Sequence, residues 1–176
     1  MKRPMDKTLY SGNDSDESAY MINVVMNLGK DVVERTRGFW YLDSGATSRM
    51  TNNKMEFVSF ISVSAFVLVK GDIWLAVAGI GDVQMDLLTD TGRYTLLLRE
   101  VRYIPELQCS SFSIHKQVSR GLTPAECVRV HFDEDGVADV ILESGVTTAV
   151  VNETSLYRID FQSTPNVSAM AILHMY

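Results

Sequence analysis

Short apolar runs separated by turn residues are the feature that most restricts how this chain folds. From residue 39 onward, runs rich in Val, Ile, Tyr and Phe alternate with Gly, Asp, Asn and Ser. Runs of this length and composition fit pleated, half-buried strands better than helices. We expect strands over residues 60–69, 74–77, 83–88, 94–98, 101–104, 128–132, 137–142, 147–151 and 156–161. The pattern therefore predicts an all-β domain.

The residues between these runs suit tight turns. Residues that tolerate positive φ stand between successive runs at Gly71-Asp72, Asp90-Thr91-Gly92, Asp135-Gly136 and Ser144-Gly145. Such residues close β-hairpins, so we expect the strands to form successive hairpins. One segment, 111–118, lacks turn residues and carries apolar side chains loosely on one face, which predicts a short helix.

The length of 176 residues fits one domain of ordinary size with tails. Residues 1–37 begin with an acidic Ser/Asp/Asn/Gly-rich stretch and carry an apolar patch at 20–26, so we expect a flexible leader with one strand-capable segment. The domain is expected over residues 38–161. Residues 162–176 read as a C-terminal linker that leads toward a following region.

Charge and composition exclude several classes of function. The formal net charge is −6 and the basic residues are scattered, so we expect no direct contact with nucleic acid. No apolar run approaches membrane-spanning length and no apolar signal core follows the first residues, so we expect a soluble, cytoplasmic protein without a membrane partner. Cys109 and Cys127 are too few and too far apart for a disulfide framework, and His115, His131 and His174 lack ligand spacing. We therefore expect reduced cysteines, no metal and no cofactor.

One carboxylate stands at the end of an apolar run, in the stretch from Phe39 to Thr47. Four large apolar residues precede Asp43, and Ser44 and Gly45 after it permit a tight turn. Because an isolated buried aspartate is costly, this arrangement indicates half of an aspartic-peptidase site. In such a site two close carboxylates share one proton. One carboxylate deprotonates a water while the other polarises the scissile carbonyl.

The second carboxylate of such a pair is not found within this chain. The triplet Asp90-Thr91-Gly92 lies between two strand-like runs, which predicts a hairpin turn rather than a second catalytic loop. A duplicated peptidase would also need two lobes, each with a core, and this chain is short for that. We therefore expect the partner to be Asp43 of a second copy, across the two-fold axis of a homodimer.

Five motifs in order give the chain a resemblance to a known family. They are Trp40–Ser48, Met50–Asn53, Val77–Gly81, Val101–Leu107 and Leu156–Ile159. From about Trp40 to Ile159 the chain resembles the retropepsin-like protease of copia-type LTR retrotransposon polyproteins. The resemblance implies a closed or partly open β-barrel with a flap hairpin and one short helix. It also implies a homodimeric endopeptidase that cleaves extended segments of its own polyprotein, in the cytoplasm and inside virus-like particles.

The resemblance assigns roles to individual residues. Asp43 would be the catalytic aspartate, Ser44 would hydrogen-bond across the dimer axis, and Gly45 would let the backbone approach the carboxylate. Ala46 continues the same loop. The flap over the substrate would contain Lys70, Gly71, Asp72, Ile73 and Trp74, with Gly71-Asp72 near its tip.

Two points about the flap stay open in the sequence. Gly79-Ile80-Gly81 is an alternative tip, since it looks like the glycine-rich flap of retroviral enzymes. Trp74 either covers the cleft or packs in the core, and core packing is the commoner role of a strand tryptophan.

The chain departs from the family pattern at three places. Arg49 stands where the family usually has His, and Ile73 and Trp74 stand where it has a second glycine and a small polar residue. Ser110–Ser113 replaces an Asn-Leu-Leu-Ser segment that packs beneath the active-site loops. The departures at the flap and at Ser110–Ser113 keep one alternative open, a catalytically idle retropepsin-like domain that is either decayed or recruited for dimerisation or peptide binding. A third alternative is an unrelated intracellular β sandwich in which Asp43 is a strand-end turn residue.

Overall fold

The computed structural model describes residues 39–69, 73–118, 128–135, 137–143, 145–151 and 156–162. Its first strands are β1 (Trp40–Asp43), β2 (Met50–Thr51), β3 (Phe57–Val69), β4 (Ile73–Thr89), β5 (Gly92–Tyr103) and β6 (Ser110–Ser113). The later strands are β7 (Arg129–Phe132), β8 (Val137–Leu142), β9 (Gly145–Val151), β10 (Tyr157–Ile159) and β11 (Phe161–Gln162). A 3-10 turn, η2 (Lys54–Glu56), and a short α-helix, α3 (Ile114–Val118), complete the described elements.

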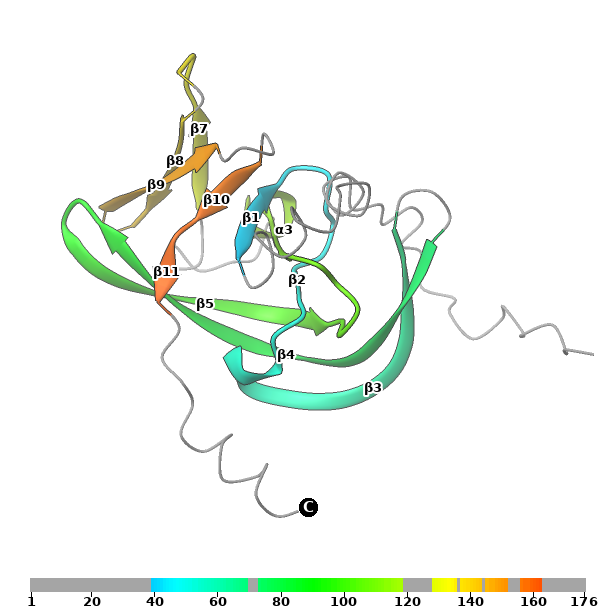
Figure 1. The fold of residues 1–176 in the computed structure, drawn as a ribbon. Coiled ribbons are helices and arrows are strands. Elements are labelled where there is room, and N and C mark those ends of the chain that lie inside the picture. The colour runs from blue at the N-terminus through cyan, green and yellow to red at the C-terminus, as the bar shows by residue number, and fades with distance from the viewer. Residues whose placement is uncertain are drawn as a thin grey trace, which may run out of the picture.

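The strands form one mixed sheet, which confirms the all-β prediction (Figure 1). Their order is β11-β4-β5-β2-β6-β1-β10-β9-β8-β7, and β3 pairs with the first half of β4. Most neighbours are antiparallel, but β1 runs parallel to β6 and β2 runs parallel to β5. Among the described strands, no pairing closes this sheet into a complete barrel, and the resemblance implies a closed or a partly open one.

The long strands β3, β4 and β5 run side by side and bend together across one side of the molecule (Figure 1). The sequence predicted separate strands at 74–77 and 83–88, and at 94–98 and 101–104. In the structure the first pair joins into β4 and the second into β5. The breaks that the sequence suggested are β-bulges, which interrupt the apolar alternation without ending the strand.

The bulge between β4 and β5 has an identifiable cause. Gly81 pairs with Val101 and Val83 pairs with Leu98, so β5 carries one extra residue here. Glu100 lies in this bulge with a φ of 55°. Its N–H donates to Oδ1 of Asp82 at 3.2 Å, and this bond stabilises the unusual backbone.

The prediction of a helix over 111–118 is only half right. Residues 111–113 belong to β6, which pairs with β1, and the helix is limited to Ile114–Val118. Local periodicity missed the strand because its serines are polar. In the folded chain those serines are buried, and their hydroxyls bond to other segments.

The core has two main parts. The larger part packs β1, the second half of β4, the middle of β5, β6 and β8 around Trp40 and Phe112. The smaller part joins the distal half of the β3–β4 hairpin to the segment after β1. Its buried members are Ala46, Met50, Val67, Val69, Leu75, Val77, Ile104 and Leu107. Burial of apolar surface in both parts is the main stabilising force.

The hairpin prediction at residues 90–92 is confirmed. Thr89 pairs with Gly92 across the turn, and Gly92 has a φ of 128°. The turn docks on the start of β9, because the N–H of Asp90 donates to the Val146 carbonyl at 3.0 Å and Oδ1 of Asp90 accepts from the Val146 N–H at 2.8 Å. The antiparallel pairs β7–β8 and β8–β9 match the other expected hairpins. The predicted leader, the tail after residue 162, residues 70–72, Cys127 and His174 lie outside the described residues.

Candidate functional site

Asp43 lies at the C-terminal end of β1, in the middle of the sheet. The three residues before it, Trp40, Tyr41 and Leu42, are buried, as their apolar character predicted. β1 is flanked by β6 on one side and β10 on the other, so both of its edges are hydrogen-bonded. The side chain of Asp43 is itself only 3% exposed. A carboxylate at this position needs hydrogen-bond donors from the surrounding chain.

Donors reach both oxygens of the Asp43 carboxylate. The backbone N–H of Gly45 donates to Oδ1 at 2.9 Å, which closes a local turn. The hydroxyl of Ser111, on β6, donates to Oδ2 at 3.1 Å. The first bond is dictated by the adjacent sequence, whereas the second joins residues that are far apart in the chain.

The loop after Asp43 is fastened to β6 and α3. Ser44 is exposed and Gly45 is half-buried, while Ala46 is buried in the smaller core cluster. The hydroxyl of Ser113 donates to the Ala46 carbonyl. Oγ of Ser113 also accepts from the Lys116 N–H at 3.1 Å. The Ser113 hydroxyl thus joins the loop to the first turn of the helix.

A buried polar network lies on the other face of the same strands. Oε2 of Glu56 accepts from Nε1 of Trp40 at 3.1 Å and from Oγ1 of Thr51 at 3.0 Å. Oε1 of Glu56 accepts from Nδ2 of Asn53 at 3.1 Å, and the Thr51 and Ser110 hydroxyls lie 2.8 Å apart. Burial raises the pKa of Glu56, while the bonds from Thr51, Trp40 and Asn53 act in the opposite direction. The network ties β1, β2 and β6 together behind Asp43.

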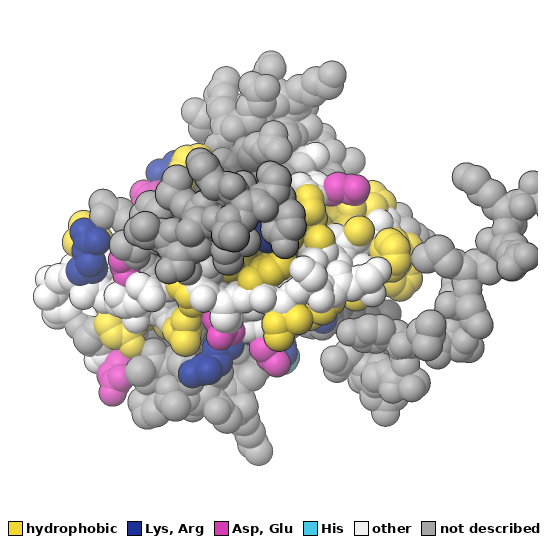
Figure 2. Space-filling model, turned by 90° about the horizontal axis from the view of Figure 1, so that it is seen from below, with side chains coloured by type: hydrophobic (Ala, Val, Ile, Leu, Met, Phe, Trp, Pro, Cys, Tyr) yellow, Lys and Arg dark blue, Asp and Glu magenta, His cyan; other side chains and the backbone are white. Residues whose placement is uncertain are grey.

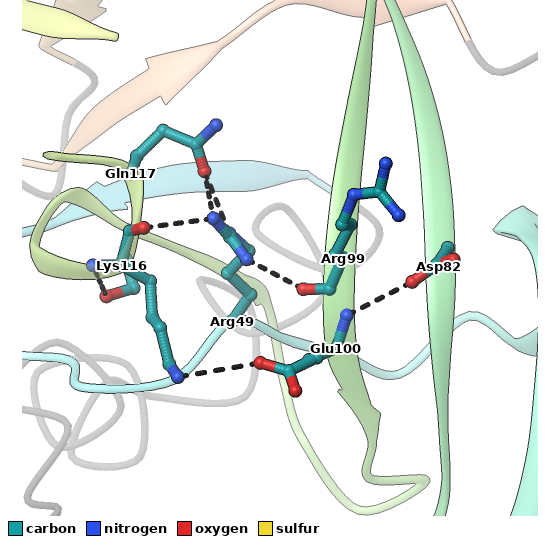
Figure 3. A network of polar contacts seen from close by, with 7 residues as sticks. Arg49, Asp82, Arg99, Glu100, Lys116 and Gln117 are labelled. Carbon is teal, nitrogen blue, oxygen red and sulfur yellow. Dashed lines mark hydrogen bonds and ion pairs between the residues drawn. The ribbon is translucent and has the colours of Figure 1, made fainter. Parts of the chain in front are cut away.

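Arg49 occupies a buried position between three elements (Figure 3). Its Nε donates to Oε1 of Gln117 at 2.8 Å, its Nη1 to the Arg99 carbonyl at 2.7 Å, and its Nη2 to the Lys116 carbonyl at 3.1 Å. Nζ of Lys116 lies 3.7 Å from Oε2 of Glu100 and forms an ion pair with it. Arg49, at the place where the resembling family has His, therefore links the start of β2 with β5 and α3.

Cys109 lies next to the site but is not a nucleophile. Burial, and then the charge of Asp43, raise the pKa of its thiol to about 12. Cys109 packs with Tyr41 and Leu156 in a small buried cluster. Because the thiolate is the reactive form of cysteine, this thiol is chemically inert at neutral pH.

The β3–β4 arm, defined here as residues 65–69 and 73–77, corresponds to the predicted flap. Val69 pairs with Ile73, so the hairpin turns at residues 70–72, which lie outside the described residues. The inner face of the arm packs in one cluster with Ala46, the residue of the Asp43 loop that is buried. The arm thus lies beside the loop that carries the carboxylate.

The alternative tip at Gly79-Ile80-Gly81 is wrong, because these residues lie in the middle of β4. The two glycines are needed for close packing instead. A Cβ on Gly79 would come within 2.1 Å of the Phe60 ring, and a Cβ on Gly81 would come within 1.9 Å of the Ser59 carbonyl oxygen. No side chain fits at those distances.

The expectation that Trp74 packs in the core is also wrong. Its side chain is 59% exposed, and it lies across from Leu68 on the outer face of the arm. Phe66, on the same face, is 50% exposed. Figure 2 views the molecule from below, the side on which β3 lies in Figure 1, and shows hydrophobic side chains spread across that face.

The structure keeps Asp90 in a structural role at the β4–β5 turn, against β9, and not on the Asp43 loop. Within the described ranges, no three His, Cys, Asp or Glu side chains gather in a way that could hold a metal ion. In the same part of the chain, no helix is long and apolar enough to cross a membrane.

The residues that sequence reasoning missed are the serines of β6. Ser111 and Ser113 lie on the face of β6 that contacts the Asp43 loop, while Ser110 and Phe112 lie on the opposite face. Polar and apolar residues alternate only from Ser111 to Ile114, and a run of four is too short to distinguish a strand from a helix. The partner of each hydroxyl was not visible either.

Comparison with known proteins gives one family. Residues 40–122 match the model of the family described as Pol polyprotein, beta-barrel domain. The matched range includes Asp43, the whole β3–β4 hairpin, β6 and α3. This match supports a retroelement Pol polyprotein region. No curated protein and no solved structure matches the chain.

Proposed function

We propose that this chain is a retropepsin-like aspartic endopeptidase from the Pol polyprotein of a copia-type retrotransposon. The observation that carries the proposal is the carboxylate of Asp43, held at the end of a buried strand by the Gly45 N–H and the Ser111 hydroxyl. The family match supports the polyprotein context, since the matched range contains this carboxylate and the elements around it. Because one fold can host many activities, the chemistry of the Asp43 site decides what this domain does.

The proposed chemistry needs a second carboxylate from a second copy of the chain. Asp90, the other aspartate in an Asp-Ser/Thr-Gly triplet, is bonded to Val146 at a hairpin turn. In an isologous dimer, the two-fold axis would pass between two Asp43 loops, and the exposed Ser44 would face the partner loop. The paired carboxylates would then hold one proton between them and activate a water for attack on a peptide bond.

The proposed substrate is an extended segment of the polyprotein itself. The β3–β4 arm would lie over this segment and supply backbone hydrogen bonds, as a flap that excludes bulk water. In this proposal residues 70–74 are the substrate-covering part, no cofactor or metal takes part, and the enzyme acts in the cytoplasm and in virus-like particles. It contacts neither nucleic acid nor a membrane.

A second candidate function is a structural β domain without catalytic activity, used in dimerisation or peptide binding. The specific observation in its favour is the burial of Asp43, which is 3% exposed in the single chain. A buried carboxylate that accepts bonds from two segments can serve to hold those segments together. The two candidates differ in whether removal of the charge abolishes cleavage or only changes stability.

The test uses the polyprotein precursor and two matched variants. Asp43→Asn keeps the shape of the side chain and removes the carboxylate, and Asp90→Asn makes the same change in the structural triplet. We expect Asp43→Asn to abolish processing and Asp90→Asn to leave cleavage at the wild-type sites. Sedimentation of the purified chain should show a dimer. Unchanged processing in the Asp43→Asn precursor would refute the peptidase and favour the structural domain.

A further inference from the structure

The hydroxyl of Ser111 is placed where it acts on the candidate catalytic carboxylate. Ser111 is 1% exposed and lies on β6, the strand that runs parallel to β1. Its Oγ donates to Oδ2 of Asp43 at 3.1 Å. Its neighbour on the same face, Ser113, bonds to the Ala46 carbonyl and not to the carboxylate. Ser111 is thus the β6 hydroxyl that reaches Asp43.

A donor in this position has two physical effects. A hydrogen bond from a neutral hydroxyl to a carboxylate favours the ionised form of that carboxylate. The bond also fixes the rotation of the carboxylate, because the Gly45 N–H holds Oδ1 while the hydroxyl holds Oδ2. An aspartate that takes a proton from water must begin ionised and correctly oriented.

Charged side chains on the neighbouring elements make contacts with several other groups. Lys116 of α3 pairs with Glu100, and Arg158 of β10 pairs with Asp160 at 2.9 Å. The guanidinium of Arg49 bonds to Gln117 and to two backbone carbonyls.

The charge of Asp43 contributes to the raised pKa of the Cys109 thiol, which stays protonated at neutral pH. The Ser111 hydroxyl is therefore a direct local influence on the charge of Asp43 that a single substitution can remove.

We propose that Ser111 is a positioning residue that orients Asp43 and favours its ionised form, and so sets the acid limit of activity. The inference rests on the proposed peptidase function and adds to it. It predicts that the pH at which activity falls on the acid side depends on the β6 hydroxyl.

The first test compares Ser111→Ala with Ser110→Ala in the purified dimer. Both changes remove a buried hydroxyl from β6, but Ser110 bonds to Thr51 and not to Asp43. For Ser111→Ala we expect kcat to fall about ten- to a hundredfold, the size of one lost bond to a charged group, with little change in KM. The acid limb of the pH profile should move up by about one pH unit. Ser110→Ala should keep the wild-type acid limb.

A second measurement does not depend on activity. Carboxyl-carbon NMR follows the protonation of Asp43 directly, in wild type and in both variants. We expect the titration midpoint of Asp43 to rise in Ser111→Ala and to stay at the wild-type position in Ser110→Ala. An inactive wild type with this rise would refute the peptidase but support the Ser111 bond. An active wild type whose Ser111→Ala variant keeps both the acid limb and the midpoint would overturn the inference.

A third pair of variants covers the case in which Ser111→Ala does not fold. Ser111→Thr keeps the hydroxyl. Ser111→Val introduces a side chain of nearly the same shape as threonine but without the hydroxyl. We expect the threonine variant to retain the wild-type acid limb and titration midpoint, and the valine variant to shift both upward. Equal behaviour of the two would contradict the proposal, since they differ only in the donor.

Discussion

Removal of the Glu56 side chain should strongly destabilise the fold while leaving the surface unchanged. Glu56 is 6% exposed, and its carboxyl group accepts three hydrogen bonds, from Trp40, Thr51 and Asn53. In Glu56→Ala, the indole N–H of Trp40 stays buried without this acceptor. Thr51 can donate its hydroxyl to the Ser110 hydroxyl instead, since the two oxygens lie 2.8 Å apart. The bond that Thr51 loses therefore costs less than the bond that Trp40 loses.

The magnitude follows from these three bonds. An unsatisfied buried donor costs about 1–3 kcal/mol, and a bond to a charged group contributes about 1.5–3 kcal/mol. The cost of burying the carboxylate, which raises the pKa of Glu56, offsets part of this sum. We therefore expect Glu56→Ala to lower the free energy of unfolding by about 3 kcal/mol. The matched control is Glu106→Ala, because Glu106 is exposed and its loss should change stability by less than about 0.5 kcal/mol.

The pH dependence of this loss has a definite sign. Because burial raises the pKa of Glu56 above its ordinary 4.5, the folded protein holds the proton more tightly than the unfolded chain does. The stabilisation is then complete below pH 4.5 and is lost as the pH rises through the folded pKa. The difference in unfolding free energy between wild type and Glu56→Ala should therefore be larger at acid pH than at neutral pH.

The assay is urea unfolding of wild type, Glu56→Ala and Glu106→Ala, followed by tryptophan fluorescence at several pH values. The difference between midpoints, multiplied by a common slope, gives the change in free energy. A loss in Glu56→Ala no larger than that in Glu106→Ala would refute the idea that this network stabilises the strands behind Asp43. A loss of stability in Glu56→Ala that grows as the pH rises would refute the upward shift of the Glu56 pKa.

Three further predictions concern backbone geometry and thiol reactivity. Glu100→Gly should raise the free energy of unfolding by about 0.5–1 kcal/mol in chemical denaturation, because a φ of 55° is unfavourable for a residue with a Cβ. Gly81→Ala should lower it by several kcal/mol or prevent folding, since the added methyl group would lie 1.9 Å from the Ser59 carbonyl oxygen. In a Cys127→Ser background, Cys109 should react with maleimide at pH 8 only after denaturation, because its pKa is about 12. Rapid labelling of the native protein would contradict that burial.

Some of the candidate site follows from short stretches of sequence. Apolar residues before Asp43 and small residues after it predict a buried strand and a tight turn, and both are present. The position of Asp90 between two strand-like runs predicts a hairpin turn, and the structure confirms it. These features depend on residues next to one another, so local composition determines them.

Other features depend on which distant segments meet. Ser111 looked like part of a helix, but pairing with β1 makes it part of a strand and directs its hydroxyl to Asp43. Gly79 and Gly81 looked like an alternative flap tip, but Phe60 and Ser59 of β3 pack against them in mid-strand. Sequence patterns record whether a residue is suited to burial and with what period, but not which partner it finds. The apolar strand that ends at Asp43 was determined by the sequence, whereas the donors and strands around its carboxylate were decided by long-range packing.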